Sequence, residues 1–421
     1  MKASIHRSRV RGKVIAPSSK SYTIRALMCA ALAQGETQIL NPLDSDDTRA
    51  AAAVLKQVGV RVQQNNDLWV VGGGRFHQPE ADLFCDESAT TLRFMSAVCS
   101  LIPGRCKLVT GPSLAKRPVK ILVEALQQLG VDCYSQDDVA PILVDSSRLK
   151  GGIAELPGDV SSQFVSALLF IAPLADEGVE IRLTTPLESK PYLLMTLECL
   201  EKFGITVESS PDLKVFKIAK QNYHPARFEV EGDWSSASYF LALGALSGEV
   251  EVSNLNPRSQ QGDIVLLDFL KEMGASIEVS DNAVTVKQAG LKAIEADLSD
   301  CIDLLPTMAV LAGAADGRSE FKGISRARIK ESNRVAAVRE GLERMGIEVA
   351  EEQDRLTITG SSPKDAIIDP KDDHRIAMAF SILGSIGGET VINNAECVSK
   401  TYPEFWDVLK GIGGEVVTDG E

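Results

Sequence analysis

Positively charged residues gather at the predicted starts of several helices, where they are least expected. The clusters are Ser19-Lys20-Ser21 with Arg25, Lys116-Arg117-Pro118, Ser189-Lys190-Pro191, Lys330-Glu331 with Arg334, Asp373-His374-Arg375, and Lys400. A cation at a helix N-terminus opposes the helix dipole, at a cost of up to about 1 kcal/mol, unless an anion binds there. Because the chain repeats this cost several times, we predict that these helix starts bind anions such as phosphates and carboxylates.

Hydroxyl, amide and carboxyl groups accompany the cations. Ser161-Ser162-Gln163 opens one predicted helix, and such residues are also ordinary N-caps. Asp303 and Glu331 are the acids nearest to the cationic helix starts. Glu331 lies between Lys330 and Arg334, where its carboxyl group could be tuned for proton transfer, although a first-turn glutamate is also favoured by the helix dipole alone. The set suits a polyol substrate that carries phosphate or carboxylate groups.

Several other classes of protein are disfavoured. The chain has no P-loop and no G-x-S-x-G motif, and its cysteines and histidines lack the spacing of a metal site. With 44 Lys and Arg against 58 Asp and Glu, the net charge of −14 disfavours nucleic-acid binding. The first residues do not form a signal peptide, and apolar stretches such as 167–175 are too short to span a membrane. We therefore expect a cytoplasmic protein with eight reduced cysteines.

The elements that carry these residues repeat along the chain. A helix-like run, a glycine and a short β-like run recur around Gly59, Gly130, Gly204, Gly274, Gly346 and Gly413, at intervals of 71, 74, 70, 72 and 67 residues. Each glycine stands where a helix C-terminus favours a left-handed backbone. Between them lie alanine- and leucine-rich segments, at 19–33, 87–101, 161–175, 235–248, 302–315 and 373–386. Since these segments are apolar on nearly all sides, we predict that they form buried helices. The repeat predicts six β-α-β-β-α-β units, arranged as two domains of three units each.

Motifs in order along almost the whole chain are similar to those of the 5-enolpyruvylshikimate-3-phosphate (EPSP) synthase family. They are Pro17-Ser18-Ser19-Lys20-Ser21 with Arg25, Leu43-Asp44-Ser45-Asp46-Asp47, Lys116-Arg117-Pro118, Ser161-Ser162-Gln163-Phe164, Ser189-Lys190-Pro191-Tyr192, Glu231-Gly232-Asp233, Lys330-Glu331-Ser332-Asn333-Arg334, Asp372-Asp373-His374-Arg375 and Lys400-Thr401-Tyr402-Pro403. The resemblance implies an α/β (α+β) enolpyruvyl-transferase fold of two domains, 19–231 and 1–18 plus 232–421. It also implies an active site in a cleft that closes on the substrates.

The resemblance further implies transfer of the enolpyruvyl group of phosphoenolpyruvate to the 5-hydroxyl of shikimate 3-phosphate, with release of phosphate and without a metal or organic cofactor. The implied proton-transfer residues are Asp303, Glu331 and Lys20. Those implied to bind phosphoenolpyruvate are Lys20, Ala89, Arg117, Gln163, Arg334, Arg375 and Lys400. Those implied to bind shikimate 3-phosphate are Lys20, Ser21, Arg25, Ser161, Ser162, Gln163, Ser189, Tyr192, Asp303 and Lys330. We expect a monomer whose partners are these two small molecules.

One segment, Glu87 to Phe94, departs from the N-A-G-T-A-M-R-P pattern of many family members. Ala89 replaces a glycine, and we expect its methyl group to narrow the phosphoenolpyruvate pocket, so that the longer inhibitor glyphosate fits poorly. Glu87 replaces an asparagine and could form an ion pair with Lys116 or Arg117.

Two alternative functions predict residues that differ from those of this chain. UDP-N-acetylglucosamine enolpyruvyl transferases usually carry a cysteine in the loop before the R-P motif, and residues 111–118 contain none. A non-catalytic, anion-binding relative is expected to have lost some of the residues Lys20, Asp303, Glu331 and Lys400, and all four are present.

Overall fold

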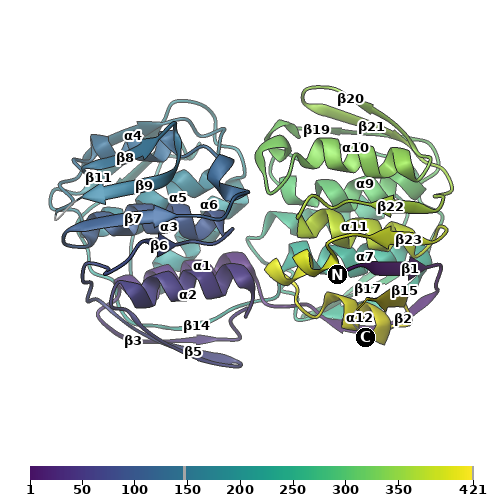
Figure 1. Cartoon of the computed structure of the whole chain (residues 1–421), viewed down its shortest axis with the longest axis horizontal. Coiled ribbons are helices and arrows are strands. Elements are labelled where there is room, and N and C mark those ends of the chain that lie inside the picture. Colours follow the sequence, from purple (N-terminus) through teal and green to yellow (C-terminus); the bar gives the residue numbers. More distant parts are fainter. Residues whose placement is uncertain (146–147, 420–421) are drawn as a thin grey trace. The chain divides into compact units, whose positions relative to one another are not determined.

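The computed structural model describes residues 1–145 and 148–419 (Figure 1). The chain divides into two compact units, Ser19–Val230 and Met1–Ser18 with Glu231–Glu421. We call them the 19–230 unit and the 231–421 unit; the second includes the N-terminal residues. Each unit has its own core of buried apolar side chains.

The 19–230 unit contains three four-stranded sheets, ordered β14-β3-β5-β4, β6-β7-β9-β8 and β10-β11-β13-β12. Their strands are β3 (Gly35–Leu40), β4 (Arg61–Asn65), β5 (Leu68–Gly73), β6 (Leu83–Phe84), β7 (Arg105–Val109), β8 (Cys133–Gln136), β9 (Val139–Asp145), β10 (Gly152–Leu156), β11 (Val179–Leu183), β12 (Glu208–Ser209), β13 (Val215–Ile218) and β14 (Arg227–Glu229).

The 231–421 unit repeats this plan, with sheets ordered β16-β17-β15-β2, β18-β19-β21-β20 and β22-β23-β1-β24. Its strands are β1 (Ala3–His6), β2 (Val10–Ile15), β15 (Gly248–Ser253), β16 (Ser276–Val279), β17 (Ala283–Lys287), β18 (Glu295–Asp297), β19 (Arg318–Lys322), β20 (Glu348–Glu351), β21 (Arg355–Thr359), β22 (Ala366–Ile368), β23 (Thr390–Ile392) and β24 (Glu415–Thr418).

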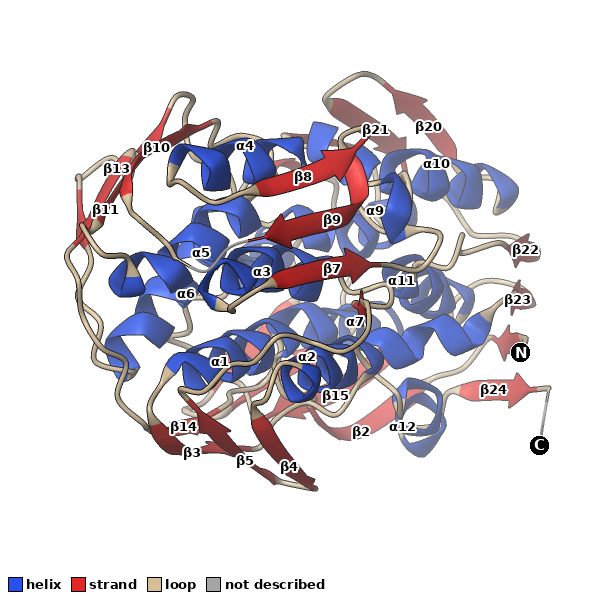
Figure 2. Cartoon of the chain, turned by 60° about the vertical axis from the view of Figure 1, so that its left-hand side comes forward, coloured by secondary structure: helices blue, strands red, loops and turns tan. Residues whose placement is uncertain are grey.

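Each sheet has one parallel pair of strands, and each repeat has one inner helix. The inner helices are α1 (Lys20–Leu32), α3 (Ala89–Val98), α5 (Ser162–Ile171), α7 (Trp234–Ser247), α9 (Leu305–Ala314) and α11 (His374–Gly384). Every residue of α3, α7 and α11 is buried. Figure 2 shows the sheets outside these helices in the 19–230 unit. The predicted buried helices are therefore confirmed.

A second helix of each repeat leads to its last two strands. These outer helices are α2 (Asp46–Gln57), α4 (Lys120–Gln128), α6 (Lys190–Lys202), α8 (Leu266–Glu272), α10 (Arg334–Arg344) and α12 (Phe405–Gly411). Short 3-10 segments complete the structure: η1 (Cys99–Leu101), η2 (Leu114–Lys116), η3 (Ala172–Leu174), η4 (Gly262–Val265), η5 (Ile302–Leu304), η6 (Ser325–Ile329) and η7 (Ala395–Lys400).

The predicted α/β fold of six repeats is confirmed, with a refinement of the order inside a repeat. The second repeat runs β6-α3-β7-α4-β8-β9, which is β-α-β-α-β-β instead of β-α-β-β-α-β. The parallel pair β6 and β7 explains this order, because parallel neighbours need a crossover, here the inner helix, between them. The outer helix then leads into an antiparallel pair.

The six repeat glycines all have a positive φ, between 77° and 100°. In each case the residue after the glycine donates its backbone N–H to a carbonyl in the last turn of the helix, as Ile205 does to Leu200 at 2.9 Å. This is the hydrogen-bond pattern of a Schellman cap, which satisfies carbonyls that the helix end leaves open. The glycine period therefore marks six helix ends, as predicted.

Within residues 1–145 and 148–419, no helix is long and apolar enough to cross a membrane. The eight cysteines carry free thiols, and all but Cys397 are buried.

Candidate active site

The residues that cap the inner helices differ between the two units. Ser19, Ser88 and Ser161 cap α1, α3 and α5 through their side chains, and Asp233 and Asp373 cap α7 and α11. None of these first turns contains an acidic residue. In the 19–230 unit the caps are serines, so no carboxylate of the cap or first turn offsets the dipoles of α1, α3 and α5.

The expectation of cations at helix starts is right for some residues and wrong for others: Lys116 ends η2 and Arg117 follows it, while α4 begins only at Lys120. Lys20 and Arg334 are the first residues of α1 and α10, and Arg375 is the second of α11. Lys400 instead ends η7, and α12 begins only at Phe405. The intervening Pro403 explains the offset, because proline favours the entry to a helix and not its interior.

Arg25 is the most deeply buried cation of the 19–230 unit, with 1% of its surface exposed. Its guanidinium donates hydrogen bonds to the Thr196 hydroxyl at 2.9 Å and to the carbonyls of Ser21 and Tyr192, both at 3.0 Å. It also lies over the rings of Phe94 and Tyr192. Burial lowers the pKa of Arg25, and among the described residues no carboxylate bonds to it. A buried cation held only by neutral groups is a strong candidate to bind an anionic ligand.

Lys20 has a carboxylate partner that the residue types alone did not single out. Its Nζ lies 2.8 Å from the Oδ2 of Asp47, and both side chains are largely buried. Asp47 lies in the first turn of α2, where the helix dipole favours an acid. The pair fixes the ammonium group of Lys20 at the start of α1.

The starts of α3 and α5 are joined through Arg93. Arg93 donates to the hydroxyl of Ser161 at 3.2 Å and to the Oε1 of Gln163 at 2.7 Å, and stacks over the ring of Phe164. The Nε2 of Gln163 donates in turn to Thr90 at 3.0 Å. These bonds set the direction of the Gln163 amide beside the first residues of α3.

Other predicted residues of this unit lie at neighbouring helix starts. Ala89 is the buried first residue of α3, and Ser162 is the first of α5. Ser189 precedes α6 with a left-handed backbone, and Tyr192 lies in the first turn of that helix. Arg117 is buried in the segment between η2 and α4.

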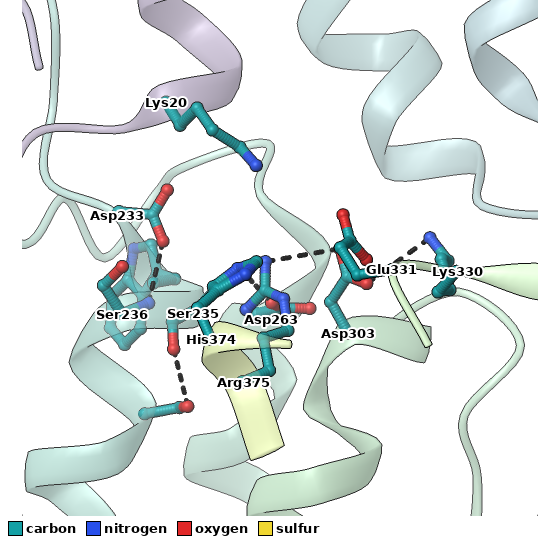
Figure 3. A network of polar contacts seen from close by, with 12 residues as sticks. Lys20, Asp233, Ser235, Ser236, Asp263, Asp303, Lys330, Glu331, His374 and Arg375 are labelled. Carbon is teal, nitrogen blue, oxygen red and sulfur yellow. Dashed lines mark hydrogen bonds and ion pairs between the residues drawn. The ribbon is translucent and has the colours of Figure 1, made fainter. Parts of the chain in front are cut away.

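In the 231–421 unit, Asp303 pairs with three cations, two of which, Lys330 and Arg375, are labelled in Figure 3. Its Oδ1 lies 2.6 Å from Arg334 and 3.4 Å from the Nζ of Lys330, and its Oδ2 lies 3.4 Å from Arg375. Glu331 also pairs with Arg334. The cluster thus joins residues from three separate segments of the chain: Asp303, Lys330 to Arg334, and Arg375.

Arg334 is held from several sides. Only 1% of it is exposed, and its Nε donates to the Oδ2 of Asp373 at 2.8 Å, besides its bonds to Asp303 and Glu331. Burial would lower the pKa of Arg334, but the three carboxylates, Asp373 foremost, outweigh it and raise that pKa. The guanidinium is a fixed positive charge.

The charges around Asp303 set its protonation. Burial would raise the pKa of Asp303, yet Lys330, Arg375 and Arg334 together lower it well below its usual value. For Lys330 the balance runs the other way, because burial lowers its pKa more than Asp303 raises it. Asp303 is therefore a carboxylate whose negative charge is stabilised by the neighbouring cations.

Asp263, in η4, has the opposite character. Burial and the negative charge of Asp303 raise its pKa to about 7. Its Oδ2 accepts a hydrogen bond from Ser235, the second residue of α7 (Figure 3). Two nearby carboxyl groups therefore differ widely in acidity, which is typical of sites that transfer protons.

Sequence reasoning missed the partners Asp47, Asp263 and Asp373 as site residues. Asp47 and Asp373 lie inside motifs that resemble those of the family, and this could have marked them as site residues. Asp263 lies in none of these motifs. The described residues contain no cluster of three or more His, Cys, Asp or Glu side chains that could hold a metal ion.

The chain is similar to known proteins along nearly its whole length. Residues 5–409 match the family model described as EPSP synthase (3-phosphoshikimate 1-carboxyvinyltransferase). A 3-phosphoshikimate 1-carboxyvinyltransferase of Dehalococcoides mccartyi is 48% identical over the full length of both chains. One of Methanocaldococcus jannaschii is 39% identical, with 97% of each chain covered.

Solved structures support the fold. An EPSP synthase of Acinetobacter baumannii superposes with a TM-score of 0.83 at 24% identity, covering 99% of this chain and 100% of that one. The enolpyruvyl transferase NikO of Streptomyces tendae gives 0.79 at 17% identity, covering 99% and 98%. The match of the family model along nearly the whole chain, together with these relatives, leads to one conclusion: the chain belongs to the EPSP synthase family.

Proposed function

We propose that this enzyme transfers the enolpyruvyl group of phosphoenolpyruvate to the 5-hydroxyl of shikimate 3-phosphate and releases phosphate, a step of the shikimate pathway. The observation that carries the proposal is the Asp303 cluster, in which one largely buried carboxylate lies within 3.4 Å of three cations. Such a cluster can exchange its internal ion pairs for bonds to anionic substrates. Family membership supplies the identity of those substrates.

Shikimate 3-phosphate is assigned to residues of the 19–230 unit, together with Asp303 and Lys330. Arg25 supports this assignment most strongly, because it is a buried cation whose described partners are neutral. The assigned residues of the unit are Lys20, Ser21, Arg25, Ser161, Ser162, Gln163, Ser189 and Tyr192. Hydroxyl groups and open helix N-termini suit phosphate and polyol oxygens.

Phosphoenolpyruvate is assigned to cations of both units: Lys20, Arg117, Arg334, Arg375 and Lys400, with Gln163 and the backbone at Ala89. Arginine forks bind carboxylates and phosphates bidentately, which suits a small dianionic substrate. We propose that the domains 19–231 and 1–18 plus 232–421 close on both substrates. Closure would exclude water and strengthen these interactions.

The reaction is an addition followed by an elimination. Glu331 or Lys20 protonates C3 of phosphoenolpyruvate, which makes C2 electron-poor, and the 5-hydroxyl oxygen forms a bond to C2 while Asp303 accepts its proton. The C2–O bond to phosphate then breaks, phosphate leaves, and C3 loses a proton. The product is the 5-O-carboxyvinyl ether, and protons gained in the first step are returned in the second.

Substrate binding would switch Asp303 on as a base. Lys330, Arg375 and Arg334 keep the pKa of Asp303 well below the usual range, which makes its carboxylate a weak base. Substrate phosphates and carboxylates draw the same cations away or neutralise them, so the pKa of Asp303 rises toward the working pH. The base is thereby active only when both anions are bound.

Ala89 is proposed to reduce inhibition by glyphosate. It is the buried first residue of α3, next to Thr90, which accepts the hydrogen bond of Gln163. A methyl group at this place takes up room beside the proposed phosphoenolpyruvate site. We also propose that the enzyme acts as a monomer in the cytoplasm.

A phosphate-release assay with both substrates tests the function. We expect release only when shikimate 3-phosphate and phosphoenolpyruvate are both present, and a loss of about 10²–10⁴-fold in kcat for Asp303→Ala and for Glu331→Ala. Unchanged activity in both variants would overturn the assignment of the proton-transfer residues. Activity with UDP-N-acetylglucosamine in place of shikimate 3-phosphate would favour the alternative transferase.

A further inference from the structure

We propose that Glu87 is a positioning residue that fixes the loop 111–117 and thereby the phosphoenolpyruvate-binding side chain of Arg117. The inference rests on the proposed function of Arg117. Glu87 immediately precedes Ser88, the N-cap of α3, and is partly buried. Its place in the chain therefore links the start of an inner helix to a loop that follows a neighbouring strand.

The carboxylate of Glu87 accepts two backbone hydrogen bonds. Its Oε1 accepts from the N–H of Ser113 at 3.0 Å, and its Oε2 accepts from the N–H of Leu114 at 2.7 Å. These amides lie at the start of η2, where no residue of the 3-10 turn itself can bond to them. A charged acceptor for two such donors is a strong local clamp.

A short path of bonds leads from this clamp to Arg117. The peptide group of Leu114 gives its N–H to Glu87, and its carbonyl accepts the N–H of Arg117 at 3.0 Å. The loop is closed at its other end as well, since Gly111 donates to the carbonyl of Asp86 at 2.9 Å. Movement of the Glu87 carboxylate would therefore loosen the turn from which Arg117 emerges.

A substitution at Gly111 can disturb the same hydrogen bonds of Glu87 independently. A methyl group added at Gly111 would overlap the Oε1 of Glu87, and the far end of that side chain would have to move away. The φ of Gly111 is not in the left-handed region, so alanine is compatible with its backbone. Gly111→Ala should thus break the clamp only when Glu87 is present.

A double-mutant cycle tests this coupling through the KM for phosphoenolpyruvate. We expect Glu87→Ala and Gly111→Ala each to raise that KM about tenfold, with a smaller change in kcat and none in the KM for shikimate 3-phosphate. The double variant should again show about a tenfold increase, because the second change has no carboxylate left to displace. Glu87→Gln, which keeps the shape but only one acceptor, should fall between wild type and Glu87→Ala.

Asp86→Asn is the matched control, since it removes one negative charge from the adjacent exposed residue and asparagine tolerates the left-handed backbone there. It should leave both KM values unchanged. Multiplicative effects in the double variant, an equal rise in both KM values, or a KM for phosphoenolpyruvate within twofold of wild type in Glu87→Ala would overturn the proposal.

Hydrogen exchange separates this proposal from the proposed function. In Glu87→Ala the amides of Ser113 and Leu114 should exchange at least about tenfold faster than in wild type, while those of β7 stay protected. Unchanged exchange would refute the clamp even if the enzyme is active. A wild-type protein without transferase activity would refute the function, and the exchange result would still decide whether Glu87 holds the loop.

Discussion

Arg25→Met removes the buried cation of the 19–230 unit while keeping much of its volume. If Arg25 is a structural residue, the variant should be much less stable than wild type. If its charge is kept for an anionic substrate, the ligand-free protein should tolerate the change and the loss should appear in substrate binding. The two roles therefore predict opposite results.

The contacts of Arg25 give the size of each effect. Arg25 makes three hydrogen bonds to neutral groups and lies over two rings, and these contacts offset the cost of taking its guanidinium out of water. Methionine removes the contacts and the burial cost together, so we expect it to change the free energy of unfolding by no more than about 2 kcal/mol. Loss of a buried, charge-assisted bond to substrate should cost about 3–5 kcal/mol, which is at least a hundredfold in affinity.

Thermal unfolding with and without shikimate 3-phosphate measures both effects. The melting temperature of wild type should rise as shikimate 3-phosphate is added, and that of Arg25→Met should stay at its ligand-free value over the same concentrations. Thr196→Val is the matched control, because it removes one neutral acceptor and leaves the cation; its ligand-induced shift should persist. A variant that is 3–5 kcal/mol less stable yet binds shikimate 3-phosphate like wild type would refute the reasoning.

Three further changes give distinct readouts. Ala89→Gly removes the methyl group from the start of α3, so glyphosate should inhibit at least about tenfold more tightly while the KM for phosphoenolpyruvate changes less; equal inhibition of both proteins would contradict this. Asp263, with its pKa raised to about 7, contributes stability below about pH 4 that is lost as pH rises through 7. Over that window the free energy of unfolding of Asp263→Asn, measured with urea, should rise relative to that of wild type by at most about 1.4 kcal/mol per pH unit. Free energies of unfolding that depend on pH in the same way in both proteins would contradict this. Gly204→Ala combines a φ of 83° with a methyl group 2.7 Å from the ring of His224 and should lower the free energy of unfolding by about 1–2 kcal/mol, whereas Gly290→Ala, with open space around it, should not.

The repeat could be predicted because its signals are local. Each of the six glycines provides the left-handed backbone that its own helix end requires, and each inner helix is rich in apolar residues that are buried in the core. The order of elements could not be predicted in the same way, since it depends on strand pairing. β14 pairs with β3 across almost the whole 19–230 unit, and β2 pairs with β15, so the first sheet of each unit is completed by a distant segment.

The site was predictable in its residue types and less so in its contacts. The resemblance named Lys20, Asp303 and Arg334, but their partners Asp47 and Asp373 depend on how helices pack, which spacing along the chain does not reveal. Lys400 differs from the local prediction for another reason: a lysine before an apolar run predicts a helix start, but Lys400 ends η7 and a proline separates it from α12.

The fate of one oxygen atom tests the central claim most directly. Phosphoenolpyruvate labelled with ¹⁸O in the oxygen between C2 and phosphorus is incubated with shikimate 3-phosphate and the enzyme, and the products are analysed by mass spectrometry. Enolpyruvyl transfer breaks the C2–O bond, so the label should appear entirely in the released phosphate, and the unlabelled carboxyvinyl group should be attached to shikimate 3-phosphate. Label retained on the three-carbon fragment would mean that the oxygen–phosphorus bond breaks, and would contradict the mechanism.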